Sequence, residues 1–151
     1  MDLRGVVLAG GKGTRLGELT KVTNKHLLPV GPLPMVYYPI KKMIGAGIMD
    51  ILLVSGTEHM GDFVELLGSG KDHKCRLTYR VQDEAGGIAQ ALGLADGFSR
   101  GARSLVILGD NIFQDSLAKF VQESEKHHDS AFVALKQVHD PQRYGVAEMK
   151  D

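Results

Sequence analysis

The feature that most constrains the fold is an apolar run, residues 5–8, that leads directly into a glycine-rich segment, residues 8–16. Glycine tolerates positive φ angles and lets the backbone approach a ligand closely. Successive N–H groups turned to one side form an anion-binding nest, and the cations Lys12 and Arg15 stand beside it. We therefore predict a buried strand that ends in a site for a nucleotide or a sugar phosphate.

The composition predicts a single globular domain. The 151 residues include 18 basic and 18 acidic side chains, so the formal charges cancel. A balanced surface argues against nucleic acid as the main partner. The lone Cys75 cannot form an internal disulfide, and no apolar run approaches the roughly 20 residues that span a membrane. Since the N-terminus does not resemble a signal peptide, we expect a soluble cytoplasmic protein without a membrane partner.

The rest of the chain alternates strands with helices. Strands are predicted at residues 3–9, 48–55, 75–81, 104–108, 131–138 and 146–149, and helices at residues 35–46, 59–67, 88–98 and 116–128. Pro39 predicts a late start or a kink in the first helix. The alternation predicts an α/β fold, a three-layer α/β/α Rossmann-like arrangement with a mostly parallel sheet. Ligands bind such sheets beyond the carboxyl ends of the strands.

Two better-known phosphate-binding motifs match the glycine segment poorly. A P-loop requires Gly-Lys followed by Ser or Thr, which the sequence lacks. A dinucleotide fingerprint requires a third glycine where Leu16 stands, and Gly17 comes one residue late. Two alternatives stay open at this point: an oxidoreductase with a dinucleotide cofactor, and a tight turn that merely requires glycine.

Five segments together resemble the sugar-phosphate nucleotidyltransferase family, and they occur in the family's order. They are Leu8-Ala9-Gly10-Gly11-Lys12-Gly13-Thr14-Arg15-Leu16, Asn24-Lys25-His26-Leu27-Leu28-Pro29, Gly87-Ile88-Ala89-Gln90-Ala91, Leu108-Gly109-Asp110-Asn111-Ile112-Phe113 and Arg143-Tyr144-Gly145-Val146. The resemblance implies that a nucleotidyl group, of the thymidylyl type, passes from a nucleoside triphosphate (dTTP) to a sugar 1-phosphate (glucose 1-phosphate) and that pyrophosphate is released. UTP as donor, and a nucleotide-binding module without catalysis, are the alternatives.

The resemblance also implies the organisation of the chain. Residues 1–151 would form the nucleotide-binding part of a single nucleotidyltransferase domain that is truncated at its C-terminus. We therefore expect the chain by itself to bind the nucleoside triphosphate weakly and to turn over slowly or not at all. Family members are commonly homo-oligomers, and the resemblance leaves a homo-oligomer open for this chain.

By this resemblance, the triphosphate lies on the glycine segment. The nucleotide-binding residues implied there are Leu8, Gly10, Gly11, Gly13, Thr14 and Arg15. Arg15 would stabilise the departing pyrophosphate, and Lys25 would bridge the α-phosphate and the sugar phosphate, which makes these two the implied catalytic residues. A solvated surface lysine is the alternative for Lys25.

Asp110 is the implied Mg²⁺ ligand and also belongs to the nucleotide site, because Mg²⁺ commonly takes one or two carboxylates and completes its octahedron with phosphates and water. A turn or helix-capping aspartate is the alternative. Gln82 and Gly87 would bind the base, since an amide offers one donor side and one acceptor side for thymine or uracil. His26 stands where longer family members often carry glutamine near the base. The sugar-binding residues implied are Leu108, Tyr144 and Gly145.

Overall fold

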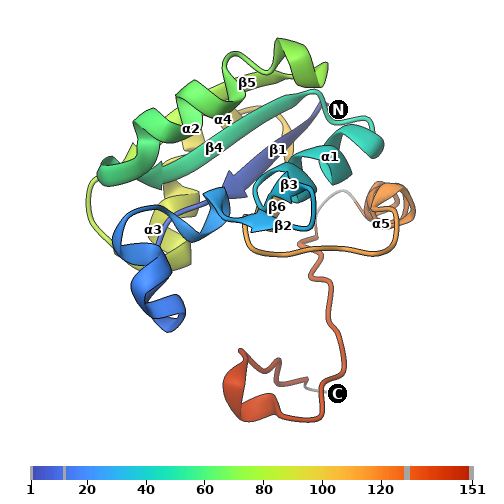
Figure 1. Cartoon of the computed structure of the whole chain (residues 1–151). Helices are drawn as coiled ribbons and strands as arrows, with labels where there is room; N and C mark the ends of the chain where they lie inside the picture. Colours follow the sequence, from blue (N-terminus) through green and yellow to red (C-terminus); the bar gives the residue numbers. More distant parts are fainter. Residues whose placement is uncertain (1, 12, 128–129, 150–151) are drawn as a thin grey trace.

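The centre of the computed structural model, which describes residues 2–11, 13–127 and 130–149, is a four-stranded sheet (Figure 1). Its strands are β1 (Leu3–Leu8), β4 (Asp50–Gly56), β5 (Arg76–Gln82) and β6 (Arg103–Leu108), in the order β5-β4-β1-β6. All neighbouring strands in this sheet are parallel. A separate antiparallel pair joins β2 (Pro29–Val30) to β3 (Leu33–Pro34).

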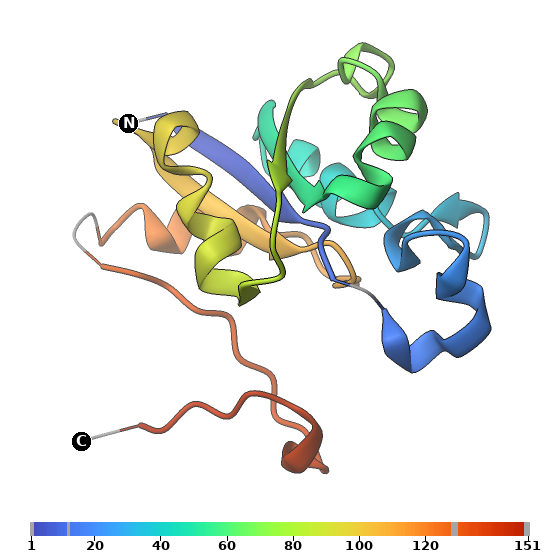
Figure 2. The same cartoon turned by 90° about the vertical axis from the view of Figure 1, so that its left-hand side faces the viewer.

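Helices cover both faces of the sheet, as the prediction of three layers requires (Figures 1 and 2). On one face Val7 packs with α1 (Tyr37–Gly45) and α2 (Met60–Leu67). On the other face Val6 packs with the apolar side chains of α3 (Gly87–Gly93) and α4 (Asp96–Ser99). Successive side chains of a strand point to opposite faces, so a strand covered on both sides must be apolar throughout.

The helices differ from the sequence-based expectation in their bounds. The single helix predicted at residues 88–98 is wrong, because Gly93 ends α3 and the chain forms one further turn as α4. Glycine costs about 1 kcal/mol relative to alanine inside a helix, which favours an end there. No helix among the described residues is long and apolar enough to cross a membrane.

Two helices begin later than predicted. α1 starts at Tyr37, so Pro39 lies in its first turn, where the missing N–H breaks no intrahelical bond. This is the late start that Pro39 predicted. The last helix, α5 (Ala118–Ser124), is shorter than the predicted 116–128. The hydroxyl of Ser116 accepts a hydrogen bond from the N–H of Ala118 at 3.2 Å and so precedes the helix. Position 128 lies outside the described residues.

The strands predicted at residues 131–138 and 146–149 are wrong. The described segment 130–149 contains no strand, and its regular structure is one short 3₁₀ helix, Pro141–Arg143. The segment runs away from the sheet in both views (Figures 1 and 2). An alternating apolar pattern forms a strand when a neighbouring strand pairs with its N–H and C=O groups, and none of the described strands lies beside this segment.

The parallel topology brings the carboxyl ends of all four strands to one edge of the sheet. β1 ends at Leu8, which is in register with Leu108 at the end of β6. β4 ends at Gly56, which is in register with Gln82 at the end of β5. Since parallel strands share one carboxyl edge, the segments that follow Leu8, Gln82 and Leu108 meet there, as predicted.

Candidate functional site

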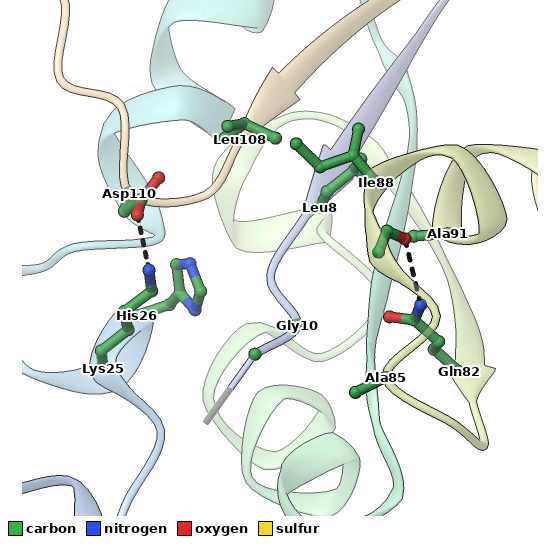
Figure 3. Close-up of a pocket in the computed structure, with 12 residues that line it drawn as sticks. Leu8, Gly10, Lys25, His26, Gln82, Ala85, Ile88, Ala91, Leu108 and Asp110 are labelled. Carbon is green, nitrogen blue, oxygen red and sulfur yellow. Dashed lines mark hydrogen bonds and ion pairs between the residues drawn. The ribbon is translucent and has the colours of Figure 1, made fainter. Parts of the chain in front are cut away.

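A cavity of about 360 Å³ lies at this edge of the sheet (Figure 3). Its lining comes from the strand ends and from the loops that follow them. The lining residues are Leu8, Gly10, Gly11, Lys25, His26, Gln82, Ala85, Gly87, Ile88, Ala91, Leu108 and Asp110. All of these except Ala85, Ile88 and Ala91 are residues that the sequence assigned to the site, so the fold brings most of the predicted set together.

Other predicted residues do not reach the cavity or lie outside the described residues. Tyr144 and Gly145 follow the 3₁₀ turn in segment 130–149, and Tyr144 is 60% exposed. Gly13 belongs to the glycine loop but does not line the cavity. Position 12 lies outside the described residues, as do the side chains of Thr14 and Arg15. The roles assigned to Thr14 and Arg15 stay predictions.

The glycine loop has the backbone that its composition predicts. Gly11 has a φ of 101° and Gly13 a φ of 57°, in the region that favours glycine. A Cβ atom on Gly13 would also lie 2.8 Å from Cγ2 of Thr20, whose hydroxyl donates to the carbonyl of Gly13 at 3.0 Å. The turn by itself therefore requires glycine at positions 11 and 13, whether or not a ligand binds there.

Lys25 and Asp110 form an ion pair on one side of the cavity (Figure 3). Lys25 opens a short 3₁₀ helix, Lys25–Leu27, and its Nζ donates to Oδ2 of Asp110 at 2.5 Å. Burial raises the pKa of Asp110, but the hydrogen bond and the charge of Lys25 outweigh it, so the net pKa lies below its ordinary value. Asp110 is therefore a carboxylate at neutral pH. Lys25, in turn, is not a freely solvated surface lysine.

His26 is buried next to this ion pair. It is 1% exposed, and burial together with the charge of Lys25 lowers its pKa from 6.5 to about 4. Its Nδ1 lies 2.6 Å from Oδ1 of Asn24, which also accepts the backbone N–H of His26 at 2.9 Å. Because that amide oxygen can only accept, Nδ1 of the neutral ring carries the proton and Nε2 does not.

Asn24 connects His26 to the glycine loop. Its Nδ2 donates to the carbonyl of Ala9 at 3.2 Å, and the same carbonyl accepts the hydroxyl of Ser55 at 3.2 Å. Asn24, His26 and Ser55 are all buried polar residues. The sequence analysis gave Asn24 no role, although Asn is a favoured residue before the first turn of a helix, and this preference could have identified it.

Gly109 fixes the backbone from which Asp110 projects. Its N–H donates to the carbonyl of Leu8 at 2.8 Å. A Cβ atom on Gly109 would lie 2.7 Å from Cδ2 of His26 and 3.2 Å from that same carbonyl oxygen. The His26 ring therefore supports the turn after β6. Figure 3 shows His26 beside Lys25 and Asp110, on the other side of the cavity from Gln82. Its place near the base stays a prediction.

The opposite side of the cavity is built from amides. The Nε2 of Gln82 donates to Oε1 of Gln90 at 2.7 Å and to the carbonyl of Gly87 at 3.4 Å. Its Oε1 faces the glycine loop, since a Cβ atom on Gly10 would lie 3.0 Å from it (Figure 3). Gln90 had no predicted role, although it lies in the segment Gly87–Ala91 that carries the family resemblance, because its contact with Gln82 depends on how α3 follows β5.

The donor set of the cavity restricts the metal that it could hold. Among the lining residues Asp110 is the single carboxylate. Within the described part of the chain, no three His, Cys, Asp or Glu side chains gather closely enough to hold a metal ion. One carboxylate beside a phosphate site fits Mg²⁺, which keeps water and phosphate oxygens as its other ligands, and does not fit a metal that the protein alone must coordinate.

Comparison with known proteins decides the family. The family model described as nucleotidyl transferase matches residues 4–151. The chain belongs to the nucleotidyl transferase family. This membership agrees with the five-segment resemblance and excludes the oxidoreductase alternative.

Several curated relatives of this chain are glucose-1-phosphate thymidylyltransferases. The chain is 40% identical over 151 residues to a glucose-1-phosphate thymidylyltransferase of Neisseria gonorrhoeae, covering 99% of this chain and 52% of that protein. It is 41% identical over 146 residues to one of Xanthomonas campestris pv. campestris, covering 96% and 50%. The chain thus spans about half the length of the curated relatives that it matches.

Solved structures give the same fold. A crystal structure of a candidate glucose-1-phosphate thymidylyltransferase from Bacillus anthracis, in complex with sucrose, superposes with a TM-score of 0.95 and 52% identity, covering 98% of this chain and 60% of that one. A UDP-glucose pyrophosphorylase complexed with UDP-glucose superposes with a TM-score of 0.69 at 23% identity, which supports the fold alone.

Proposed function

We propose that this chain is the nucleotide-binding part of an enzyme of the glucose-1-phosphate thymidylyltransferase type. The reaction joins dTTP to glucose 1-phosphate, releases pyrophosphate and gives dTDP-glucose. One observation carries the proposal: a single cavity holds a lysine–carboxylate pair on one side and an amide that can bind a base on the other. The names of the relatives at 40% and 41% identity support it.

The residues of the cavity suit a reaction that needs positioning and charge neutralisation more than a protein nucleophile. An oxygen of the sugar phosphate attacks the α-phosphorus, the bond to the β-phosphate breaks, and pyrophosphate leaves. Lys25 would hold the α-phosphate and the sugar phosphate together, and Arg15 would stabilise the leaving group. Asp110 would hold Mg²⁺, which neutralises phosphate charge when it is bound.

The amide side would recognise the base. Gln82 presents an acceptor oxygen, and the N–H of Gly87 lies in the first turn of α3, where backbone N–H groups lack an intrahelical acceptor. This pair matches the N3–H and a carbonyl of thymine, and it matches uracil equally well. UTP is therefore the second candidate substrate, since one methyl group is worth only about 1–3 kcal/mol. A homo-oligomer and a cytoplasmic location stay predictions from the sequence.

The test combines ligand binding with turnover. We expect dTTP with Mg²⁺ to raise the melting temperature of the wild-type chain, and Asp110→Asn to remove the dependence of that rise on Mg²⁺. Asp115→Asn is the matched control, because Asp115 is exposed and lies outside the cavity. Release of pyrophosphate from dTTP and glucose 1-phosphate would show that the chain catalyses by itself, whereas slow or absent release is the result expected of a chain that spans about half the length of its relatives. If no nucleoside triphosphate raises the melting temperature, the proposal is wrong.

A further inference from the structure

Gln90 holds the side-chain amide of Gln82 in a single orientation. Its Oε1 accepts two hydrogen bonds, from Nε2 of Gln82 at 2.7 Å and from the backbone N–H of Gly86 at 3.0 Å. The same nitrogen of Gln82 also reaches the carbonyl of Gly87 at 3.4 Å. Both amide hydrogens of Gln82 are therefore directed at the start of α3.

This arrangement leaves Gln82 with an acceptor and no donor for a ligand. A primary amide can present either its oxygen or its NH₂ group, and its neighbours decide which. Turning the Gln82 amide over would place its oxygen against the oxygen of Gln90, so two acceptors would face each other. In Figure 3 the Gln82 oxygen points toward the interior of the cavity and the nitrogen points toward α3.

Gly86 makes room for this contact. A Cβ atom at position 86 would lie 2.4 Å from both Cδ and Oε1 of Gln90, so the Gln90 amide occupies the place of that missing side chain. The backbone at Gly86, with φ −82° and ψ 12°, is one that alanine adopts without strain. Glycine at position 86 is therefore required by the position of Gln90 and not by the turn.

We infer that Gln90 is a specificity-determining residue, which acts through Gln82 and does not touch the base itself. With the Gln82 oxygen fixed toward the cavity, a base must offer a donor at that point and an acceptor to the Gly87 N–H. Thymine and uracil do so with N3–H and a carbonyl, whereas cytosine offers an acceptor at N3 and an amino group beside it. This inference rests on the proposed function, because it assumes that the base binds on the amide side.

UTP and CTP are the probes, because these two nucleotides differ only at the base edge in question. The measurement is the ratio of their dissociation constants with Mg²⁺ for the 151-residue chain. We expect the wild type to prefer UTP about thirtyfold, because the wrong edge loses two hydrogen bonds, each worth about 1 kcal/mol in an exposed site. Gln90→Met, which keeps the length of the side chain and removes the acceptor, should reduce the preference to about twofold.

Three further variants separate orientation of the amide from general damage. Gln90→Glu keeps the accepting oxygen and should keep the preference for UTP. Gly86→Ala leaves Gln90 in the sequence but displaces its amide, so it should behave like Gln90→Met. Gly93→Ala is the control, because it makes the same exchange at the other end of α3, where an added Cβ meets nothing within 4 Å. It should resemble the wild type.

The outcomes distinguish this inference from the proposed function. A wild-type chain that binds neither UTP, CTP nor dTTP contradicts the proposed function. A wild-type chain that binds dTTP and UTP but does not prefer UTP over CTP overturns the inference alone. So does a Gln90→Met or Gly86→Ala variant that binds with the wild-type ratio.

Discussion

The two sides of the cavity hold their functional side chains by different means. On the lysine side (Lys25, His26 and Asp110), the supporting groups are buried: His26 is 1% exposed, and Asn24, which anchors it, is 5% exposed. On the amide side (Gln82, Gly87 and Gln90), the supporting hydrogen bonds lie at the surface. The lysine side is therefore supported by buried residues, and the amide side is supported by groups at the surface.

This difference separates the two tasks that we propose for the site. Buried hydrogen-bonded groups are costly to disturb, because a lost partner leaves a desolvated donor or acceptor behind. The lysine side should thus be rigid, which suits the positioning of phosphates. Exposed hydrogen bonds can be exchanged with water at little cost, so the amide side can change its base preference without loss of the fold.

Gly109→Ala should cause the largest loss of stability on the lysine side. The added Cβ would lie 2.7 Å from the His26 ring and 3.2 Å from the carbonyl oxygen of Leu8, a backbone atom that cannot move freely. We expect a loss of about 3 kcal/mol in the free energy of unfolding, measured by urea denaturation. The same change in a His26→Ala background should cost clearly less. Equal costs in both backgrounds would show that the His26 ring does not confine this turn.

Asn24→Ala should cost about 2 to 3 kcal/mol in the free energy of unfolding. The substitution removes the acceptor of two hydrogen bonds from His26 and one donor to Ala9, all in a buried place. Ser55→Ala is the matched control, because Ser55 donates to the same carbonyl of Ala9 but does not contact His26. A similar loss in both variants would show that Asn24 stabilises the fold through its hydrogen bond to Ala9 and not through those with His26.

Acidification from pH 7 to pH 5 should destabilise the chain by about 2 kcal/mol through His26. Its pKa is about 4 in the folded chain and 6.5 as the ordinary value, so the unfolded state takes up the proton first. The stabilisation is complete above pH 6.5 and is lost as the pH falls toward 4.

Urea denaturation at several pH values measures this dependence, and His26→Gln is the control that should flatten it. Asp110, whose pKa lies below its ordinary value of 3.8, changes the free energy of unfolding only at lower pH, outside the range from pH 7 to pH 5. A slope between pH 7 and pH 5 that is unchanged in His26→Gln would assign the dependence to another group.

Gln90→Ala should have the smallest effect on stability. Its side chain is exposed, and its hydrogen bonds can be replaced by bonds to water, so we expect a change of less than about 0.5 kcal/mol. Urea denaturation of this variant beside Asn24→Ala compares the two sides directly. A loss on the amide side as large as that of Asn24→Ala would remove the distinction between them.

Much of the fold and most of the site could be predicted from the sequence. Apolar runs identify the strands β1, β4 and β6. Alternating apolar and polar residues identify the edge strand β5, whose burial alternates in the same way. The glycines after β1 identify the loop at Gly10, and the segments of the family resemblance identify Lys25 and Asp110. These signals are local, so they can be detected without knowing how the chain packs.

Tertiary structure decided the features that depend on neighbours distant in the sequence. Segment 130–149 has the alternation of a strand but no strand beside it among the described residues, so its pattern does not become a sheet. His26 lines the cavity, as its place in the family segment predicted, but its burial against Gly109, which also makes it a support of the turn after β6, does not show in the sequence. Gln90 contacts Gln82 only because α3 folds back over the end of β5. In each case the deciding contact joins segments that the local pattern treats separately.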